Sequence, residues 1–497
     1  MKEIIIIGSG FGGLVAGNLL AKRGHKVTIF ESHSMPGGYT AGFYRKGFYF
    51  ESGTLSFESS PTVFKAMKDI GVYDKIQFVE QKLRFVSDNY DEIPENYEEY
   101  KNMLYKGFPD DKDRLDAYFT ETDKINEAMG EMDKPMFYVY KGLPFLLSIL
   151  SLISSGRKLS KIMRQYQDKT SSEFVGMFFH ENSKLYRILK NSGYPDMPAY
   201  ICSTSSIFSD YWTVKGGMQS WANVLSDNFK SLGGTLKLNS YVDKIITSNG
   251  CAVGVTSKGE VYNADYVISA CDYKKTFLKL LDNKTLIPVE LTRKVEAAAV
   301  SEAFFTVYLG LGMPNEELSK HMKIPHVSLF DEKPDFDIYN SEDKDFFSKT
   351  SITLYSPSMV NQKHAPEGKS SLMLQTIVPY KWMQNWGGGD KNKYEQLKEE
   401  AALAMIEKAS KLIPDLKKYI EFKDSATPLT YERYTHNTDG ASSAWSWNPK
   451  KKFYNNGIQS MEVETPVKNL YIGSCWANQI GGIPGALGAA YLCSKKI

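Results

Sequence analysis

An α/β fold is predicted, in which a nucleotide-binding sheet is interrupted by inserted segments. Three stretches support this: a strand–helix–strand unit at 4–31, strand-like segments between 210 and 290, and a strand followed by a glycine-rich helix at 469–491. Strands that alternate with helices are typical of parallel sheets. We therefore expect a discontinuous Rossmann-like domain with an inserted α+β domain. The expected boundaries are 1–90, 210–290 and 450–497 for the first domain, and 91–209 and 291–449 for the second.

The first unit has the pattern of a dinucleotide cradle. The run Ile4–Ile7 ends at Gly8, Gly10 and Gly13 complete G-x-G-x-x-G, and a second strand ends at Glu31. The glycines permit a tight turn, close approach of backbone N–H groups to a pyrophosphate, and close packing of helix on strand. The helix N-terminus holds the anion through its free N–H groups and partial positive charge. Glu31 is placed to bind a ribose and disfavours a 2′-phosphate, so we expect an adenosine diphosphate head group.

Two simpler interpretations of this unit fit less well. A lone glycine triplet is often only a turn, but here strand, helix, second strand and terminal acid occur together. A signal peptide is rejected because the apolar run is short, contains Glu3 and breaks at Gly8. Further along, Pro36-Gly37-Gly38 would let the chain run close along the far side of a cofactor.

The composition is that of a soluble globular protein. Of 497 residues, 42% are hydrophobic and 24% charged, and the net charge of +2 gives no reason to expect nucleic acid as a partner. The five cysteines are scattered and never in C-x-x-C spacing, and the seven histidines are isolated. Neither a disulfide framework nor a metal site is indicated, so we expect a reducing, cytoplasmic location.

Two regions leave the nucleotide-binding pattern. Residues 57–135 are charged, aromatic and helix-prone, and they predict an inserted domain. Residues 290–430 leave the pattern again and predict strands and a long helix. The expected strands are 304–311, 351–355 and 372–378, and the expected amphipathic helix is 393–412.

The most apolar segment is 143–153. It is followed by Arg157, Lys158, Lys161 and Arg164. About a dozen apolar residues cannot span a bilayer, which needs roughly twenty. Two interpretations of 143–164 stay open: a helix buried in the protein, or a helix that dips into one leaflet with basic residues on the headgroups. The second predicts a peripheral contact with the inner face of the membrane.

The last organised stretch combines a short strand with a glycine-rich helix start. Leu470, Tyr471 and Ile472 end at Gly473, and Gly481-Gly482-Ile483-Pro484-Gly485 opens a helix of small residues. Proline is well placed near a helix start because its missing N–H costs nothing there. Such a helix presents N–H groups and a positive end to whatever lies ahead. The alternative is ordinary tight helix packing.

With both ends described, the chain resembles the flavin-dependent phytoene desaturase, carotenoid isomerase and retinol saturase family, within the flavin amine oxidase superfamily. The resemblance rests on five segments that bracket nearly the whole chain. They are 4–53, Lys215-Gly216-Gly217-Met218, Val242-Asp243-Lys244-Ile245, 264–270 and 470–490. The first segment is shared by many FAD proteins, and the last is more diagnostic. The resemblance implies FAD, bound by the discontinuous domain.

The resemblance also implies which residues bind this cofactor. They are Gly8, Ser9, Gly10, Gly12, Gly13, Glu31, Gly37, Gly38, Val242, Gly473, Gly482, Pro484, Gly485 and Ala486. Val242 would pair with adenine through its backbone, and the positive end of the last helix would face the flavin. The segment 433–440 resembles a stretch that lies close to the flavin in family members.

The chemistry implied by the family is hydride transfer to or from a carbon chain, since the cofactor carries the difficult step. Desaturation, saturation and cis/trans isomerisation of a polyene, isoprenoid or fatty-acyl lipid all fit. His436, Asp439 and Tyr434 are the candidate proton-transfer groups because of their residue types. Two alternatives stay open: an amine oxidase, for which Trp445, Trp447 and Cys475 are of interest, and a flavin-bearing lipid carrier without turnover.

Overall fold

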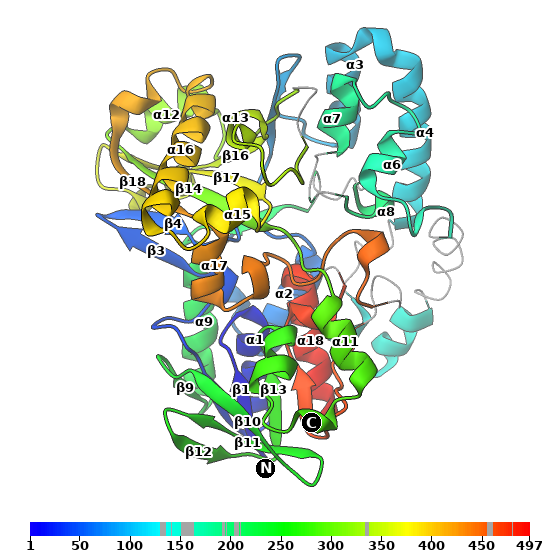
Figure 1. Cartoon of the computed structure of the whole chain (residues 1–497), viewed down its shortest axis with the longest axis vertical. Coiled ribbons are helices and arrows are strands. Elements are labelled where there is room, and N and C mark those ends of the chain that lie inside the picture. The colour runs from blue at the N-terminus through cyan, green and yellow to red at the C-terminus, as the bar shows by residue number, and fades with distance from the viewer. Residues whose placement is uncertain are drawn as a thin grey trace.

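The computed structural model combines a nucleotide-binding half, a second sheet and a helical lobe (Figure 1). It describes residues 1–129, 136–140, 142–150, 164–190, 194, 196–202, 208, 210–332, 337–454, 461–479 and 481–497. The two ends of the chain lie close together at the bottom of the view, and the blue first helix, residues 11–21, lies beside the red last helix, residues 482–496.

A five-stranded parallel sheet forms the centre of the nucleotide-binding half. Its order is β19 (Leu470–Ile472), β13 (Tyr266–Ser269), β1 (Glu3–Ile7), β2 (Lys26–Phe30) and β9 (Thr235–Lys237). Four isoleucines of β1 are buried, as expected for a parallel strand covered on both faces. The sheet therefore joins strands from the start, middle and end of the chain, and the predicted Rossmann-like fold is confirmed.

Three helices cover this sheet and pack on one another. They are α1 (Phe11–Ala21), α9 (Met218–Ser231) and α18 (Gly482–Lys496). Every residue of α1 is buried, because it lies between the sheet and the other two helices. Gly17 lets α1 approach α9, since a Cβ there would lie 3.2 Å from Phe229. Close packing of α1 on α18 thus ties the first helix to the last.

Smaller elements complete this half. They are β3 (Gly42–Arg45), β4 (Phe48–Glu51), β5 (Phe78–Glu80), β8 (Trp212–Val214), β10 (Val242–Ser248), β11 (Cys251–Ser257), β12 (Glu260–Asn263), α2 (Ser60–Ile70), α10 (Tyr273–Lys275) and α11 (Val289–Ala297). β10, β11 and β12 form an antiparallel sheet, and β3 pairs with β4.

A seven-stranded sheet lies above the nucleotide-binding half (Figure 1). Its order is β18 (Ile420–Ala426), β14 (Ala303–Leu311), β17 (Ser370–Val378), β16 (Ile352–Tyr355), β15 (His326–Leu329), β6 (Arg84–Val86) and β7 (Asp91–Glu92). The helices that accompany it are α12 (Asn315–Met322), α13 (Phe346–Lys349), α14 (Pro357–Val360), α15 (Trp382–Gly387), α16 (Lys391–Ser410) and α17 (Pro428–Thr435). The three strands and the long helix expected between 290 and 430 are confirmed with small changes in their ends.

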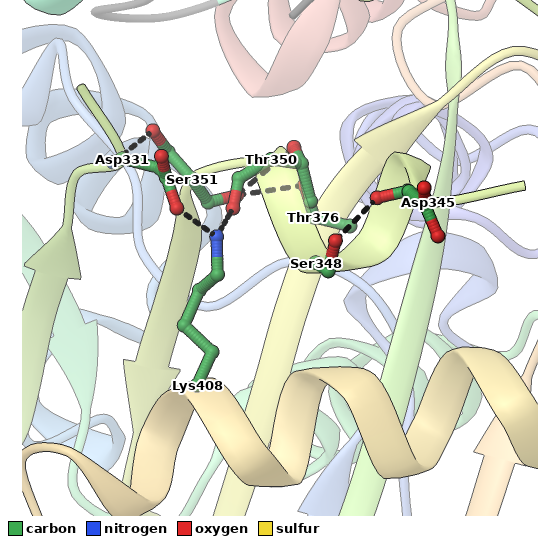
Figure 2. Close-up of polar contacts among 7 residues, drawn as sticks. All are labelled: Asp331, Asp345, Ser348, Thr350, Ser351, Thr376 and Lys408. Carbon is green, nitrogen blue, oxygen red and sulfur yellow. Dashed lines mark hydrogen bonds and ion pairs between the residues drawn. The ribbon is translucent and has the colours of Figure 1, made fainter. Parts of the chain in front are cut away.

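A buried ion pair fixes α16 to the sheet (Figure 2). Lys408 Nζ lies 2.7 Å from the Asp331 carboxylate, and both side chains are less than 10% exposed. The same ammonium donates to the backbone oxygen of Thr350, whose hydroxyl hydrogen-bonds with Thr376 of β17 at 3.0 Å. Because a charge buried without a partner is costly, this contact holds helix and strands in one arrangement.

The helical lobe has a separate aromatic core. Its helices are α3 (Tyr97–Gly107), α4 (Lys112–Met129), α6 (Ser171–Val175), α7 (Lys184–Lys190) and α8 (Ala199–Cys202). Tyr118, Phe119 and Phe174 pack together in this core.

Two sequence interpretations need correction. Residues 57–135 do not form one inserted unit, because α2 packs into the nucleotide-binding core through Val63 and Met67, while β6 joins the second sheet. The apolar segment is helical over the described residues 142–150, and its leucines are not buried in the protein. Local apolar patterns did not reveal either placement. The expected domain boundaries stay a prediction.

Candidate functional site

A cavity of about 730 Å³ lies at the carboxyl edge of the five-stranded sheet. Four parallel strands deliver residues to its wall within two positions of their ends: Gly8 after β1, Glu31 after β2, Ala270 after β13 and Ser474 after β19. This edge is where open parallel α/β sheets bind their ligands. The opposite wall comes from the seven-stranded sheet and α17, through Tyr308 and neighbouring residues.

The glycine loop leaves backbone surface open to the cavity. Gly8 has a φ of +99°, a conformation that glycine adopts without strain. The backbone can therefore turn directly from β1 toward α1. Within the described part of the chain, no atom lies within 4 Å of the position that a Gly10 Cβ would take. Gly10 caps α1 without any side-chain hydrogen bond from the described residues. The first N–H groups of α1 are therefore available to an anion.

A second helix N-terminus reaches the same cavity from the end of the chain. Gly482 begins α18 and lines the wall together with Ala486. Gly481 before it has a φ of +69°, and a Cβ there would lie 1.9 Å from the Ser443 oxygen. Only glycine fits this turn, which sets the direction of α18. The positive end of this helix therefore adjoins the cavity, as the sequence predicts.

The carboxylate of Glu31, which is predicted to bind the ribose, faces the cavity. Its oxygens accept hydrogen bonds from the backbone N–H and hydroxyl of Ser9, both at 2.8 Å, and from the His33 N–H at 2.8 Å. These donors hold the carboxylate in place while it faces the cavity. Val242 lies on the wall beside Tyr241, at the start of β10. An acid after the second strand is the usual partner of a ribose.

Nine of the predicted cofactor residues line the cavity, and five do not. The nine are Gly8, Gly10, Gly12, Glu31, Gly37, Gly38, Val242, Gly482 and Ala486. Ser9 is fully buried and positions Glu31. Gly13 and Gly473 serve packing, since a Cβ on them would meet Gly8 and Ile268 at 2.1 and 2.4 Å. Pro484 and Gly485 lie in the first turn of α18, away from the lining surface. Cofactor contact by these five stays a prediction.

Two of the three predicted catalytic residues, Tyr434 and His436, line the cavity near Glu31. Tyr434 is 49% exposed, with its ring 5.5 Å from that of His33. His436 packs against the Tyr241 ring at 5.4 Å, and burial, then nearby Lys275, lowers its pKa. Their catalytic role stays a prediction, and their position does not favour it.

Asp439, the third, lies outside the cavity lining. Burial raises the pKa of its carboxyl, and the neighbouring Glu432 adds to this effect. Residue type and the resemblance of 433–440 to a family stretch near the flavin selected all three candidates, and neither gives the distance of a side chain from the reacting atoms.

Aromatic side chains form a further part of the cavity wall. Tyr39 and Tyr431 stack with ring centroids 5.6 Å apart and an angle of 10° between their planes. The Tyr39 hydroxyl donates to the Gly440 oxygen at 2.6 Å, and Tyr431 hydrogen-bonds with Thr306 of β14 at 2.7 Å. Burial raises the pKa of both phenols, which therefore remain neutral. Sequence reasoning missed this pair because its members are far apart in the chain.

Two further wall residues follow the last strand. Cys475 and Trp476 come directly after Ser474 and lie beside the start of α18. Burial raises the pKa of the Cys475 thiol to about 12, with Asp272 as a second cause, so this side chain stays a neutral thiol. Trp445 lies elsewhere, stacked on Phe453 at 3.9 Å within the core.

The wall chemistry fits FAD. Two helix N-termini without side-chain caps reach the cavity near the glycine loop and can donate to a diphosphate. The Glu31 carboxylate on the wall can accept hydrogen bonds from a ribose. Aromatic side chains line a further part of the wall. In the part of the chain that the structure describes, no group of three or more His, Cys, Asp or Glu side chains is arranged to hold a metal ion. Among the same residues, no helix has the length and apolar content needed to cross a membrane.

Comparisons with known proteins agree with this assignment. The profile of the family described as "Flavin containing amine oxidoreductase" matches residues 11–497. The all-trans-retinol 13,14-reductase of Danio rerio is 25% identical, over 100% of this chain and 86% of that protein. A 4,4'-diapophytoene desaturase (4,4'-diapolycopene-forming) of Methylomonas sp is 26% identical, over 91% and 88%. The crystal structure of an oxidoreductase from Methanosarcina mazei superposes with a TM-score of 0.63 at 15% identity, with both chains fully covered.

Proposed function

The chain belongs to the family of flavin-containing amine oxidoreductases, and we propose that it uses FAD to desaturate, saturate or isomerise carbon–carbon bonds of an apolar polyene, isoprenoid or fatty-acyl lipid. The observation that carries this proposal is the aromatic wall of the cavity, with Tyr39 stacked on Tyr431. Such a wall offers an unsaturated chain a large apolar surface. The reductase and the desaturase named above act in opposite redox directions, and both match this chain over most of its length.

The residues of this chain bind and orient, while the flavin supplies hydride transfer to or from a carbon. The N-termini of α1 and α18 hold negative charge at the diphosphate and beside the ring. Glu31 fixes the ribose, held itself by Ser9 and His33. Neutral Tyr39 and Tyr431 keep the far wall free of charge, which suits a chain that must be held without water.

The amine oxidase alternative has less support. Trp445 is in the core and takes no part in the cavity wall. Cys475 does line the cavity, but its buried thiol is neutral and therefore a weak nucleophile. A flavin-bearing carrier without turnover has no separate observation in its favour.

A spectroscopic experiment tests the proposed reaction. Oxidised holoenzyme is mixed without oxygen with phytoene, and photoreduced holoenzyme is mixed with lycopene or all-trans-retinol, while the flavin absorbance near its visible maximum is followed. We expect bleaching or recovery of the flavin with at least one of these lipids, and a matching change in the extracted lipid. Bleaching by putrescine or benzylamine alone, with no response to any polyene, would refute the proposal.

We also propose that the helix at 142–150 contacts a lipid surface. Leu143, Leu146, Leu147 and Leu150 are 56–67% exposed, and their spacing places them on one face of the helix. Lys495 lies beside this helix, 4.9 Å above the Phe145 ring, where its ammonium can meet an anionic headgroup. Residues 151–163, with the basic positions 157, 158 and 161, lie outside the described part. A lipid substrate would then enter the protein directly from the membrane.

Flotation with vesicles of phosphatidylcholine and phosphatidylserine tests this contact. Replacing both Leu143 and Leu147 by Glu should lower the bound fraction more than tenfold, because a buried leucine contributes about 1.5 kcal/mol or more. The matched control is Leu403→Glu, which changes an exposed leucine of α16 that is 46% exposed. Equal binding of the double variant and the control would rule out this helix as the contact.

A further inference from the structure

A short segment that follows the seven-stranded sheet reaches across to the nucleotide-binding half. It comprises residues 432–438, the last turn of α17 and the three residues after it, and we call it the clasp. Residues 433–437 of the clasp line the cofactor cavity. His436 caps α17 with a φ of +57°, the left-handed conformation in which helices commonly end. The chain therefore leaves the helix at this residue.

Aromatic contacts join the clasp to two segments of the nucleotide-binding half. The centroid of the Tyr434 ring lies 5.5 Å from that of His33, which follows β2. The centroid of the His436 ring lies 5.4 Å from that of Tyr241, which precedes β10. These two segments are tied together at Glu31, because the N–H of the residue before Tyr241 donates to the Glu31 backbone oxygen at 2.7 Å. The clasp therefore lies beside the part of the cavity wall that carries the predicted ribose acid.

Two polar contacts join the clasp to the segment after β13. The Thr438 N–H donates to the buried Asp272 carboxylate at 2.6 Å. Lys275 Nζ lies 3.9 Å from the Glu432 carboxylate. Asp272 and Lys275 line the cavity, as the two aromatic partners of the clasp also do. One short stretch of chain therefore contacts three separate segments around a single cavity.

Two tyrosines at this contact remain exposed. Tyr434 is 49% exposed and Tyr241 is 45% exposed, and both line the cavity. Aromatic side chains at a cavity offer stacking surface to a planar ligand, and every nucleic-acid base has a face that stacks on such rings. The Glu31 carboxylate on the same wall can accept hydrogen bonds from ribose hydroxyls. Aromatic surface next to a ribose acceptor fits an adenosine.

We propose that the clasp is the lid of the adenosine subsite. Residues 432–438 close over the adenosine of FAD, Tyr434 and Tyr241 supply aromatic surface for its purine, and the cofactor leaves only when the clasp lifts. This assigns Tyr434 and His436 to cofactor binding rather than to proton transfer. The clasp follows the seven-stranded sheet, so release of FAD requires the two halves of the molecule to separate at this contact. The inference rests on the FAD site and holds for any lipid substrate.

Release and affinity of the nucleotide test the clasp without turnover. The rise of flavin fluorescence after dilution of the holoenzyme measures the rate of FAD release. Calorimetric titration of the full-length apoprotein with ADP, which carries the adenosine and the diphosphate but no flavin, measures the affinity of the subsite. Tyr434→Ala should weaken ADP binding about tenfold, as for one lost stacking contact, and should speed FAD release by a similar factor.

A second variant separates a lid from a local stacking contact. Thr438→Pro removes the N–H that donates to Asp272 and leaves both tyrosines in place. Asn437 before it is extended, with a ψ of 136°, which a following proline allows. This variant should also speed FAD release severalfold, whereas stacking by Tyr434 alone predicts no change.

The matched control is Tyr419→Ala. Tyr419 is 37% exposed, directly precedes β18 and lies outside the cavity lining. Its replacement should leave ADP affinity and FAD release within about twofold of the parent. The melting temperature of each variant reports whether it has folded.

Three results would overturn the clasp: unchanged ADP affinity in Tyr434→Ala, unchanged FAD release in Thr438→Pro, or the same effects in the Tyr419 control. Failure of the proposed function is separate. A protein whose FAD release depends on the clasp but which shows no flavin redox change with any lipid keeps the clasp and loses the lipid oxidoreductase proposal. A protein that reacts with polyenes and releases FAD equally fast in parent and variants does the reverse.

Discussion

Replacement of Gly12 by alanine should destabilise the protein through the contact between its first and last helices. A Cβ on Gly12 would lie 2.3 Å from the Gly473 oxygen and 3.3 Å from the Ala486 oxygen. Both obstacles are backbone atoms, so no side chain can rotate away. One obstacle follows β19 and the other lies in α18. The methyl group must therefore move α1 away from the last segment of the chain.

The cost follows from the size of this overlap. Extra methyl groups in a packed core typically cost about 1–3 kcal/mol, and contact with rigid backbone places this one near the upper end, at about 3 kcal/mol. Proteins of this kind have only about 5–15 kcal/mol of stability. We expect the melting temperature of the apoprotein to fall by about 3 °C. FAD affinity should also fall, because both helix N-termini shift.

Gly10→Ala is the matched comparison. Gly10 lies two residues earlier with a φ of −64°, which alanine adopts without strain, and no described atom comes within 4 Å of its Cβ position. Its methyl group points into space that the diphosphate needs. The apoprotein should therefore keep its melting temperature, while retention of FAD falls. Thermal denaturation of the apoprotein and flavin fluorescence after gel filtration measure the two effects separately.

Two outcomes contradict this reasoning. An apoprotein with Gly12→Ala as stable as the parent would show that α1 and α18 do not meet as closely as described. Normal FAD retention by Gly10→Ala would show that the diphosphate does not approach this part of the loop.

Three further changes test other contacts. Glu31→Gln should weaken FAD binding about tenfold, because a charged hydrogen-bond acceptor is lost. Fluorescence titration of the apoprotein with FAD measures this affinity. An unchanged affinity would show that the ribose lies elsewhere. Lys408→Met should cost about 3–5 kcal/mol in denaturant unfolding, because the buried Asp331 carboxylate loses the ammonium group that neutralises it. A second change, Asp331→Leu, should restore much of this loss. Burial raises the pKa of Glu51 to about 8, so its native state binds a proton that the unfolded state releases above about 4.5. The stability that this group contributes is present below pH 4.5 and is lost as the pH rises through 8. Glu51→Gln should therefore make the melting temperature fall less between about pH 5 and pH 8.5. An unchanged slope would assign the pH effect to other carboxyls.

The diphosphate cradle could be predicted from sequence because its physical causes are local. A β-branched strand, a glycine turn and a helix start follow one another within a few residues, so spacing alone implies their arrangement. The terminal glycine helix was predictable for the same reason. Glu31 was found because an acid at the end of the second strand has a fixed place in such a unit.

The flavin end could not be predicted in this way. Tyr39 and Tyr431 meet across nearly four hundred residues, and Tyr194 stacks on Trp447 from another distant segment. No periodicity in one sequence indicates which distant side chains become neighbours. His436 was selected for its pKa-suitable ring, but its neighbours place it near the ribose.

The cofactor site depends on contacts that span the whole chain. β13 pairs with β1 on one side and β19 on the other, so the middle of the chain must be in place before first and last strands share a sheet. The cavity receives one helix N-terminus from residue 11 and another from residue 482. The two N-termini come together only when the chain between them has folded and the sheet has formed. Neither helix alone therefore forms the anion site. A ligand that bridges both N-termini binds only the folded state and stabilises it in proportion to its concentration over its dissociation constant. Loss of FAD should therefore loosen α18 before it affects the seven-stranded sheet, whose hydrophobic core is separate.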